Sequence, residues 1–147
     1  MDFEQRRVDL EREYQGSNPF DRAYAFLAFH LEWADALSAA DPEAAIRQYR
    51  LAEDCQLTIG TGATSGGEGL ASMGALYEIL GKRADLVERL ADRLPDPAAA
   101  RRRLDEALVL WKRILDDPNG LSEDTPAAER HRRLTEKLAA RRSPGGR

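Results

Sequence analysis

The chain has 147 residues, of which 42% are apolar and 33% are charged, enough apolar side chain to bury the core of one domain. Its net charge of −4 gives the surface as a whole no electrostatic attraction for nucleic acid, which we consider an unlikely partner. A single cysteine, Cys55, excludes an intramolecular disulfide and a cysteine-based zinc cluster.

The sequence also indicates where the protein works. No apolar run approaches the roughly 20 residues of a membrane span, and the start, MDFEQRRVDLERE, lacks the apolar core of a signal peptide. We therefore expect a cytoplasmic protein with no membrane partner. Only three of the 22 basic residues are lysines, a bias typical of a high-GC bacterial genome.

Capping signals divide the chain into seven expected helices. Asn18-Pro19, Asp41-Pro42 and Asp96-Pro97 each combine a capping side chain with a proline in the first turn, and Gly16 is the expected C-cap of the first helix. The alternation that marks a strand is absent. The predicted helices cover residues 2–15, 19–39, 42–57, 68–81, 83–94, 97–116 and 126–140.

The segment TIGTGATSGG, residues 58–67, is the one extended stretch of low helix propensity inside the chain. Ser65 and Glu68 form a capping box for the helix that follows it. Gly81 is expected to end that helix, and residues 141–147 are expected to form a disordered basic tail.

The helix over 68–81 carries Leu70, Met73, Gly74 and Tyr77 along one face. A glycine inside a helix costs roughly 1 kcal/mol relative to alanine. Because such a cost is usually tolerated where another backbone comes close, Gly74 and Tyr77 predict a helix that packs tightly against a second helix.

These residues resemble the tetratricopeptide repeat, a 34-residue helix A–turn–helix B hairpin. A first match to helix A consists of Leu70, Met73, Gly74 and Tyr77, with Gly81 at the turn. A second match to helix A consists of Leu104, Ala107, Leu108 and Trp111. Residues 45–52, AIRQYRLA, match helix B. The Gly-rich segment departs from the pattern, because it is about seven residues too long.

The resemblance implies an all-α fold of antiparallel helical hairpins. The implied fold comprises about three helix pairs with an N-terminal capping helix, and it forms a single domain of residues 1–140. In such arrays the A helices line a groove that binds a peptide. The implied function is a protein-interaction adaptor or scaffold whose partner is a protein or peptide.

The implied groove has a basic cluster, Arg102, Lys112 and Arg113, suited to acidic side chains or a C-terminal carboxylate. The residues expected to line it are Glu68, Ala75, Glu78, Arg102, Asp105, Val109, Lys112 and Arg113.

No motif in the chain marks a catalytic, metal or cofactor site, and we expect none of the three. The loop GTGATSGG lacks the Gly-Lys-Ser/Thr ending of a phosphate-binding loop. His30 and His131 belong to no HExxH or ExxH pair. Glu32 and Asp35 have no spacing that marks an acid–base pair, although a pair that meets only in space leaves no such signature.

Two other functions compete with the adaptor. The first is a small all-α enzyme, or an accessory protein for one, with a pocket between helices near the Gly-rich loop. The second is a regulatory domain that contacts nucleic acid through its arginine-rich C-terminal third, which includes Arg101, Arg130 and Arg133. A homodimer is also plausible, since the first helix has a sparse apolar face.

Overall fold

The computed structural model describes the backbone of residues 2–145 and the side chains of residues 2–141. All the regular structure in that part of the chain is helical, so the predicted all-α class is confirmed. The elements are α1 (Phe3–Glu13), α2 (Pro19–Leu37), α3 (Pro42–Thr61), α4 (Gly66–Arg93), α5 (Pro97–Leu115), the 3-10 turn η1 (Leu121–Asp124) and α6 (Ala127–Gly145).

The chain divides into two compact units, which we call the N-unit (Met1–Ile79) and the C-unit (Leu80–Arg147). Helix α4 contributes its first half to the N-unit and its second half to the C-unit. Within residues 2–145, no helix is both long enough and apolar enough to cross a membrane. The single domain over 1–140 and the disordered tail over 141–147 stay predictions, and residues 146 and 147 lie outside the described chain.

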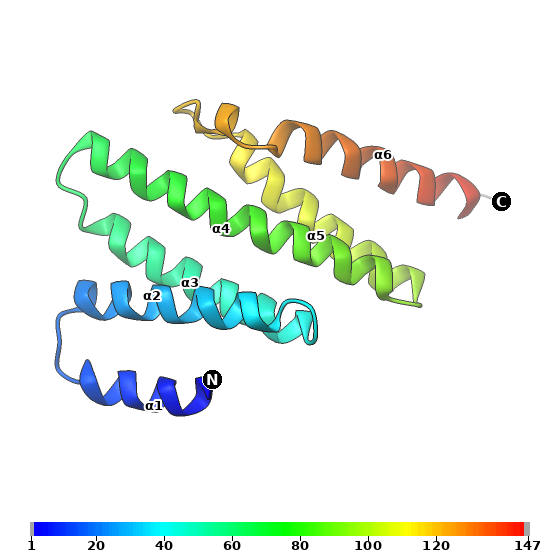
Figure 1. Cartoon of the computed structure of the whole chain (residues 1–147). Coiled ribbons are helices and arrows are strands. Elements are labelled where there is room, and N and C mark those ends of the chain that lie inside the picture. Colours follow the sequence, from blue (N-terminus) through cyan, green and yellow to red (C-terminus); the bar gives the residue numbers. More distant parts are fainter. Residues whose placement is uncertain (1, 146–147) are drawn as a thin grey trace. The chain divides into compact units, whose positions relative to one another are not determined.

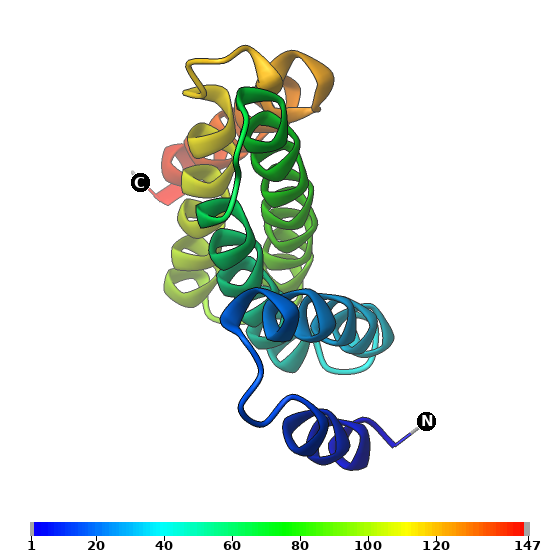
Figure 2. The ribbon, with the colours of Figure 1, turned by 90° about the vertical axis from the view of Figure 1, so that its left-hand side faces the viewer.

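In the N-unit, α2 and α3 lie side by side (Figures 1 and 2). Both begin at the predicted caps: Asn18 Oδ1 accepts from the backbone N–H of Asp21 at 2.9 Å, and Asp41 Oδ1 accepts from that of Ala44 at 3.1 Å. Their buried faces contribute Phe26, Phe29, Ile46 and Tyr49 to the core of this unit, and the first half of α4 contributes Leu76 and Tyr77.

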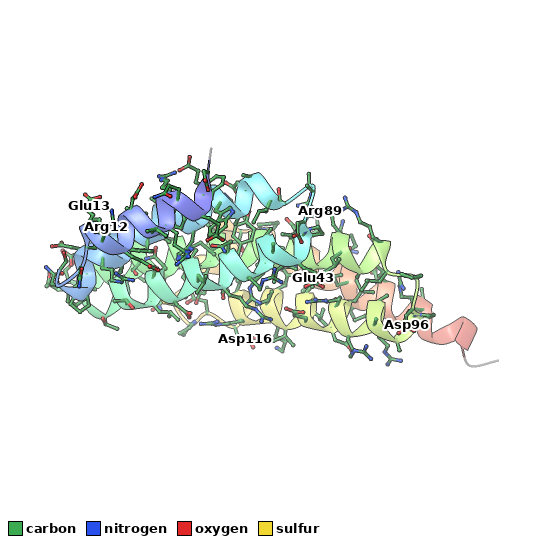
Figure 3. All side chains as sticks on the ribbon, turned by 90° about the horizontal axis from the view of Figure 1, so that it is seen from below. Arg12, Glu13, Glu43, Arg89, Asp96 and Asp116 are labelled. Carbon is green, nitrogen blue, oxygen red and sulfur yellow. The ribbon has the colours of Figure 1, made fainter. Side chains whose placement is uncertain are left out.

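Helix α1 contacts α2 through the ring of Phe3 and the side chain of Arg6. The ring of Phe3 stacks on that of Trp33 with centroids 5.6 Å apart, and Arg6 Nη1 lies 2.7 Å from Glu32 Oε2. No residue of α1 is buried, and Arg12 and Glu13 at its end lie on the outside of the molecule (Figure 3). The helix ends at Glu13 with Tyr14 as its C-cap, earlier than the predicted cap at Gly16. Gly16, whose φ of 79° is left-handed, lies in the turn that follows.

In the C-unit, the second half of α4 is buried on most of its surface. Leu86 and Val87 are almost fully buried there, and α5 and α6 contribute Leu104, Trp111 and Leu134. Helices α5 and α6 pack against each other. Asp96 caps α5 as predicted, since its carboxylate accepts from the backbone N–H of Ala98 at 3.3 Å.

The predicted turn at Gly81 is wrong, because α4 runs unbroken from Gly66 to Arg93 (Figure 1). Gly81 lies inside the helix and makes room for a side chain of α5. A Cβ at this position would lie 3.1 Å from Cη2 of Trp111, closer than carbon atoms normally approach. Residues 66–94 therefore form no hairpin, and the tetratricopeptide arrangement is not confirmed.

The predicted reason for Gly74 is also wrong. A Cβ added at Gly74 would meet no atom within 4 Å, so no neighbour requires glycine there. Tyr77, one turn later, is buried as the pattern indicates. The close approach of a neighbouring helix to α4 occurs at Gly81, where the ring of Trp111 packs, and not at Gly74.

The two glycines give a matched test of this assignment. Gly74→Ala should raise the free energy of unfolding by about 1 kcal/mol, because it improves helix propensity and meets no neighbour. Gly81→Ala should lower it, because the new methyl group presses on Trp111, whose 2% exposure leaves the ring little room to move. Urea unfolding of both variants measures the two changes, and an equal gain in both would contradict the packing described.

Candidate functional site

The predicted binding residues lie on two helices in different units. Glu68, Ala75 and Glu78 belong to the first half of α4, in the N-unit. Arg102, Asp105, Val109, Lys112 and Arg113 belong to α5, in the C-unit. A groove shared by all eight stays a prediction, and each group is described here within its own unit.

The five predicted residues of α5 share the exposed side of that helix, which we call the α5 face. The opposite side buries Leu104, Ala107, Trp111 and Ile114 in the C-unit. Val109 is 67% exposed. It lines a shallow groove of about 410 Å³ with Leu108, Lys112, Arg113 and Asp116.

Of the three cations on the α5 face, only Lys112 makes an ion pair within residues 2–141. Within residues 2–141, Arg102 and Arg113 make no ion pair. Lys112 Nζ lies 3.1 Å from Asp116 Oδ1, but both side chains are more than 60% exposed, so this bridge contributes little. The face therefore combines an apolar strip with two free guanidinium groups.

The Gly-rich segment is shorter than predicted, since α3 extends to Thr61 and α4 begins at Gly66. Hydroxyl groups stabilise this extension: Thr58 Oγ1 donates to the carbonyl of Asp54 at 3.1 Å, and Thr61 Oγ1 donates to that of Thr58 at 2.6 Å. Only residues 62–65 are non-helical. At Gly62 an added Cβ would lie 2.8 Å from the ring of Phe20, so a side chain at this position would displace that ring.

The predicted capping box at the start of α4 is present in a modified form. Ser65 Oγ accepts from the backbone N–H of Glu68 at 3.0 Å. Glu68 Oε2 accepts from both the backbone N–H and the hydroxyl of Thr64, at 2.7 and 2.9 Å, instead of from Ser65. These hydrogen bonds from Thr64 lower the pKa of Glu68, so the carboxylate is ionised at neutral pH.

A cavity of about 470 Å³ lies beside this loop, within the N-unit. Helices α2, α3 and α4 contribute its polar side chains, and Ile59, Ala71 and Ala75 are among its apolar walls. Its floor includes the buried Gln56, whose Nε2 donates to Ser72 Oγ at 3.0 Å. The polar residues that line it are Tyr24, Gln56, Glu68 and Ser72.

A second cavity, of about 320 Å³, lies between α2 and α3 and includes His30 and Cys55. Burial raises the pKa of the Cys55 thiol to about 11, so the group is protonated at neutral pH and is a poor nucleophile. His30 Nδ1 lies 2.7 Å from Gln48 Oε1. Burial lowers the pKa of His30, and the hydrogen bond with Gln48 offsets only part of this effect.

Four basic residues of α6 pair with acidic residues of α4 inside the C-unit, an arrangement we call the α4–α6 ladder. Glu88, 8% exposed, accepts from two cations at once. Burial alone would lower the pKa of Lys137, but its hydrogen bonds with Asp92 and Glu88 raise it. The pairs are Arg130–Asp85 (3.7 Å), Arg133–Glu88 (2.6 Å), Lys137–Glu88 (3.0 Å), Lys137–Asp92 (2.8 Å) and Arg141–Asp92 (3.7 Å).

Sequence reasoning missed this ladder, although its signal is present. Acidic residues at 85, 88 and 92 and basic residues at 130, 133, 137 and 141 each recur at helical spacing. The two rows are about 45 residues apart in the chain, so only the packing of the helices shows that they meet.

The two acidic residues considered for acid–base chemistry have structural partners. Glu32 pairs with Arg6, and Asp35 accepts a hydrogen bond from the hydroxyl of Tyr49. Residues 2–141 contain no group of three or more potential metal ligands.

The chain matches no protein-family model, and no curated protein or solved structure matches it either.

The α4–α6 ladder predicts a specific cost for losing one carboxylate. Glu88→Gln should lower the free energy of unfolding by about 1–2 kcal/mol, because Arg133 loses its ion-pair partner and Lys137 keeps only Asp92. Glu136→Gln is the control: its bridge to Arg132 is 65% and 66% exposed, and its loss should leave stability almost unchanged. Urea unfolding compares the two variants, and equal effects would contradict the ladder's role.

His30 predicts a pH dependence of stability. Because burial lowers its pKa below the ordinary 6.5, the unfolded chain takes up a proton more readily than the folded one. The free energy of unfolding should therefore fall as the pH drops through about 6.5, and level off below the folded pKa. His30→Gln should remove this fall and His131→Gln should retain it, as measured by urea midpoints between about pH 8 and pH 5.

Proposed function

We propose that the protein is an interaction adaptor whose α5 face binds an acidic, amphipathic segment of a protein partner. The observation that carries the proposal is the exposure of Val109 next to Arg113, a guanidinium group with no ion pair in the described chain. Exposed apolar side chains flanked by arginine are typical of protein-binding surfaces.

The two kinds of group suit two parts of one ligand. An apolar side chain of the partner would enter the groove beside Leu108 and Val109 and remove both from water. Carboxylates on either side of it would meet Arg102 and Arg113, which can each hold a carboxylate with two parallel hydrogen bonds. A single helix face buries a small area, so the complex is expected to be weak, with a Kd on the order of micromolar.

The competing functions have less support. Nucleic-acid binding would use the arginines of the C-terminal third, but four cations of α6 already pair with carboxylates in the α4–α6 ladder. An enzyme would need reactive groups in a cavity. The thiol of Cys55 is protonated at neutral pH, and Nδ1 of His30 is hydrogen-bonded to Gln48 and not to a nucleophile.

The experiment begins with a photo-crosslinking amino acid at position 109, in cells of the native host. The partner it captures is then purified, and its affinity for the wild type is compared with that for the double variant Arg102→Glu, Arg113→Glu. We expect the charge reversal to weaken binding at least tenfold, because two attractive ion pairs become repulsive. The affinity of the wild type should also fall with added salt.

Arg47→Glu is the matched control, since Arg47 is an exposed arginine of α3, in the N-unit. Its affinity should equal that of the wild type. Unchanged binding by the double variant would overturn the proposal. Capture of a second copy of the chain would identify the predicted homodimer as the complex that the α5 face forms.

A further inference from the structure

The cavity beside the Gly-rich loop has the size of a small-molecule site and is open to solvent on one side. Its volume of about 470 Å³ falls within the range of ligand pockets in proteins, and helices α2, α3 and α4 of the N-unit all contribute to its walls. It does not share a residue with the α5 face, so an inference about it is independent of the proposed function.

The floor of the cavity presents polar groups that the protein does not satisfy. Gln56 is 5% exposed, and its one hydrogen bond, from Nε2 to Ser72 Oγ, leaves Oε1 without a donor in the described chain. This oxygen is accessible from the cavity, because Trp111 Nε1 is the one fully buried side-chain nitrogen or oxygen of the described residues that lacks a partner. The cavity therefore offers an accessible acceptor to whatever occupies it.

The remaining polar groups of the lining favour a positive charge. Glu68 is ionised, and its Oε1 accepts no hydrogen bond from the described chain. Tyr24 is 60% exposed and presents an aromatic ring, whose face attracts cations. No lysine, arginine or histidine lines the cavity, so nothing there competes for the carboxylate or repels a cation.

An anion is the main alternative, because glycines precede the start of α4 and helix N-termini attract phosphate. In this protein, side chains of the chain itself already occupy the N-terminus of α4. The carboxylate of Glu68 lies in the first turn, and Ser65 takes the backbone N–H groups of Glu68 and Gly69. An incoming anion would meet a negative charge already bound.

We propose that this cavity binds a small organic ammonium ion. The ammonium group lies between the carboxylate of Glu68 and the ring of Tyr24 and donates to Gln56 Oε1, while its alkyl part contacts Ile59 and Ala75. The substrate class is a primary aliphatic amine, recognised by charge and by hydrogen-bond donation.

The test is an NMR titration of the isotope-labelled full chain with three probes of similar size: n-butylammonium chloride, 1-butanol and sodium butyrate. Only the ammonium ion should shift the backbone amides of Gly62, Ala63 and Ser72 and the side-chain amide of Gln56 in a saturable way. Its Kd is expected on the order of millimolar, because the probe has few atoms.

Variants identify the groups responsible. Glu68→Gln should weaken binding about tenfold or more, because a charged partner is lost, while an amide oxygen still accepts from Thr64 and keeps the start of α4 intact. Tyr24→Leu should weaken it several-fold. Glu78→Gln, which removes an exposed carboxylate of α4 that does not line the cavity, should bind like the wild type.

Circular dichroism and the spectra of the free variants confirm that each is folded before the titrations are compared. Equal affinity for 1-butanol, saturable shifts with butyrate, an unchanged Kd in Glu68→Gln, or no saturable shift at the cavity residues would each overturn the proposal. None of these outcomes bears on the α5 face, so the two proposals fail separately.

Discussion

The packing of the Trp111 ring on the bare backbone of Gly81 is the contact on which the architecture depends. Burying a tryptophan removes about 150–250 Å² from water, which stabilises the fold by about 4–6 kcal/mol. The indole N–H of Trp111 has no acceptor within residues 2–141, a cost of about 1–3 kcal/mol. The gain exceeds the cost, and the ring packs where Gly81 has no side chain, inside the unbroken helix α4.

The continuity of α4 gives its two halves different tasks. The second half packs against α5 and makes ion pairs with α6 through Asp85, Glu88 and Asp92, so these carboxylates stabilise the C-unit. The first half begins with the Thr64–Glu68 cap and lines the cavity of the N-unit, where the ionised Glu68 remains accessible. The α5 face is free for a partner because the buried side of the same helix carries Trp111.

Sequence patterns predicted the features that depend on neighbouring residues. The caps at Asn18, Asp41 and Asp96 lie where the capping signals indicated, and the 3.6-residue spacing separated the buried side of α5 from its exposed side. Features that depend on distant residues were beyond that reasoning. Gly81 has the local signature of a helix end, and only the ring of Trp111, 30 residues away, gives it a different role. The α4–α6 ladder and the cavity likewise require helices to meet in space.

The central claim, that residues 66–93 form one helix, can be measured as a distance. Spin labels at Leu70 and Arg93, both exposed, in a Cys55→Ser background report the separation of two points on α4 by pulsed electron resonance. One continuous helix predicts about 35 Å, from 23 residues at 1.5 Å each. A hairpin turning at Gly81 would bring the labels to roughly 10 Å, the spacing of packed helices, and that result would contradict the account.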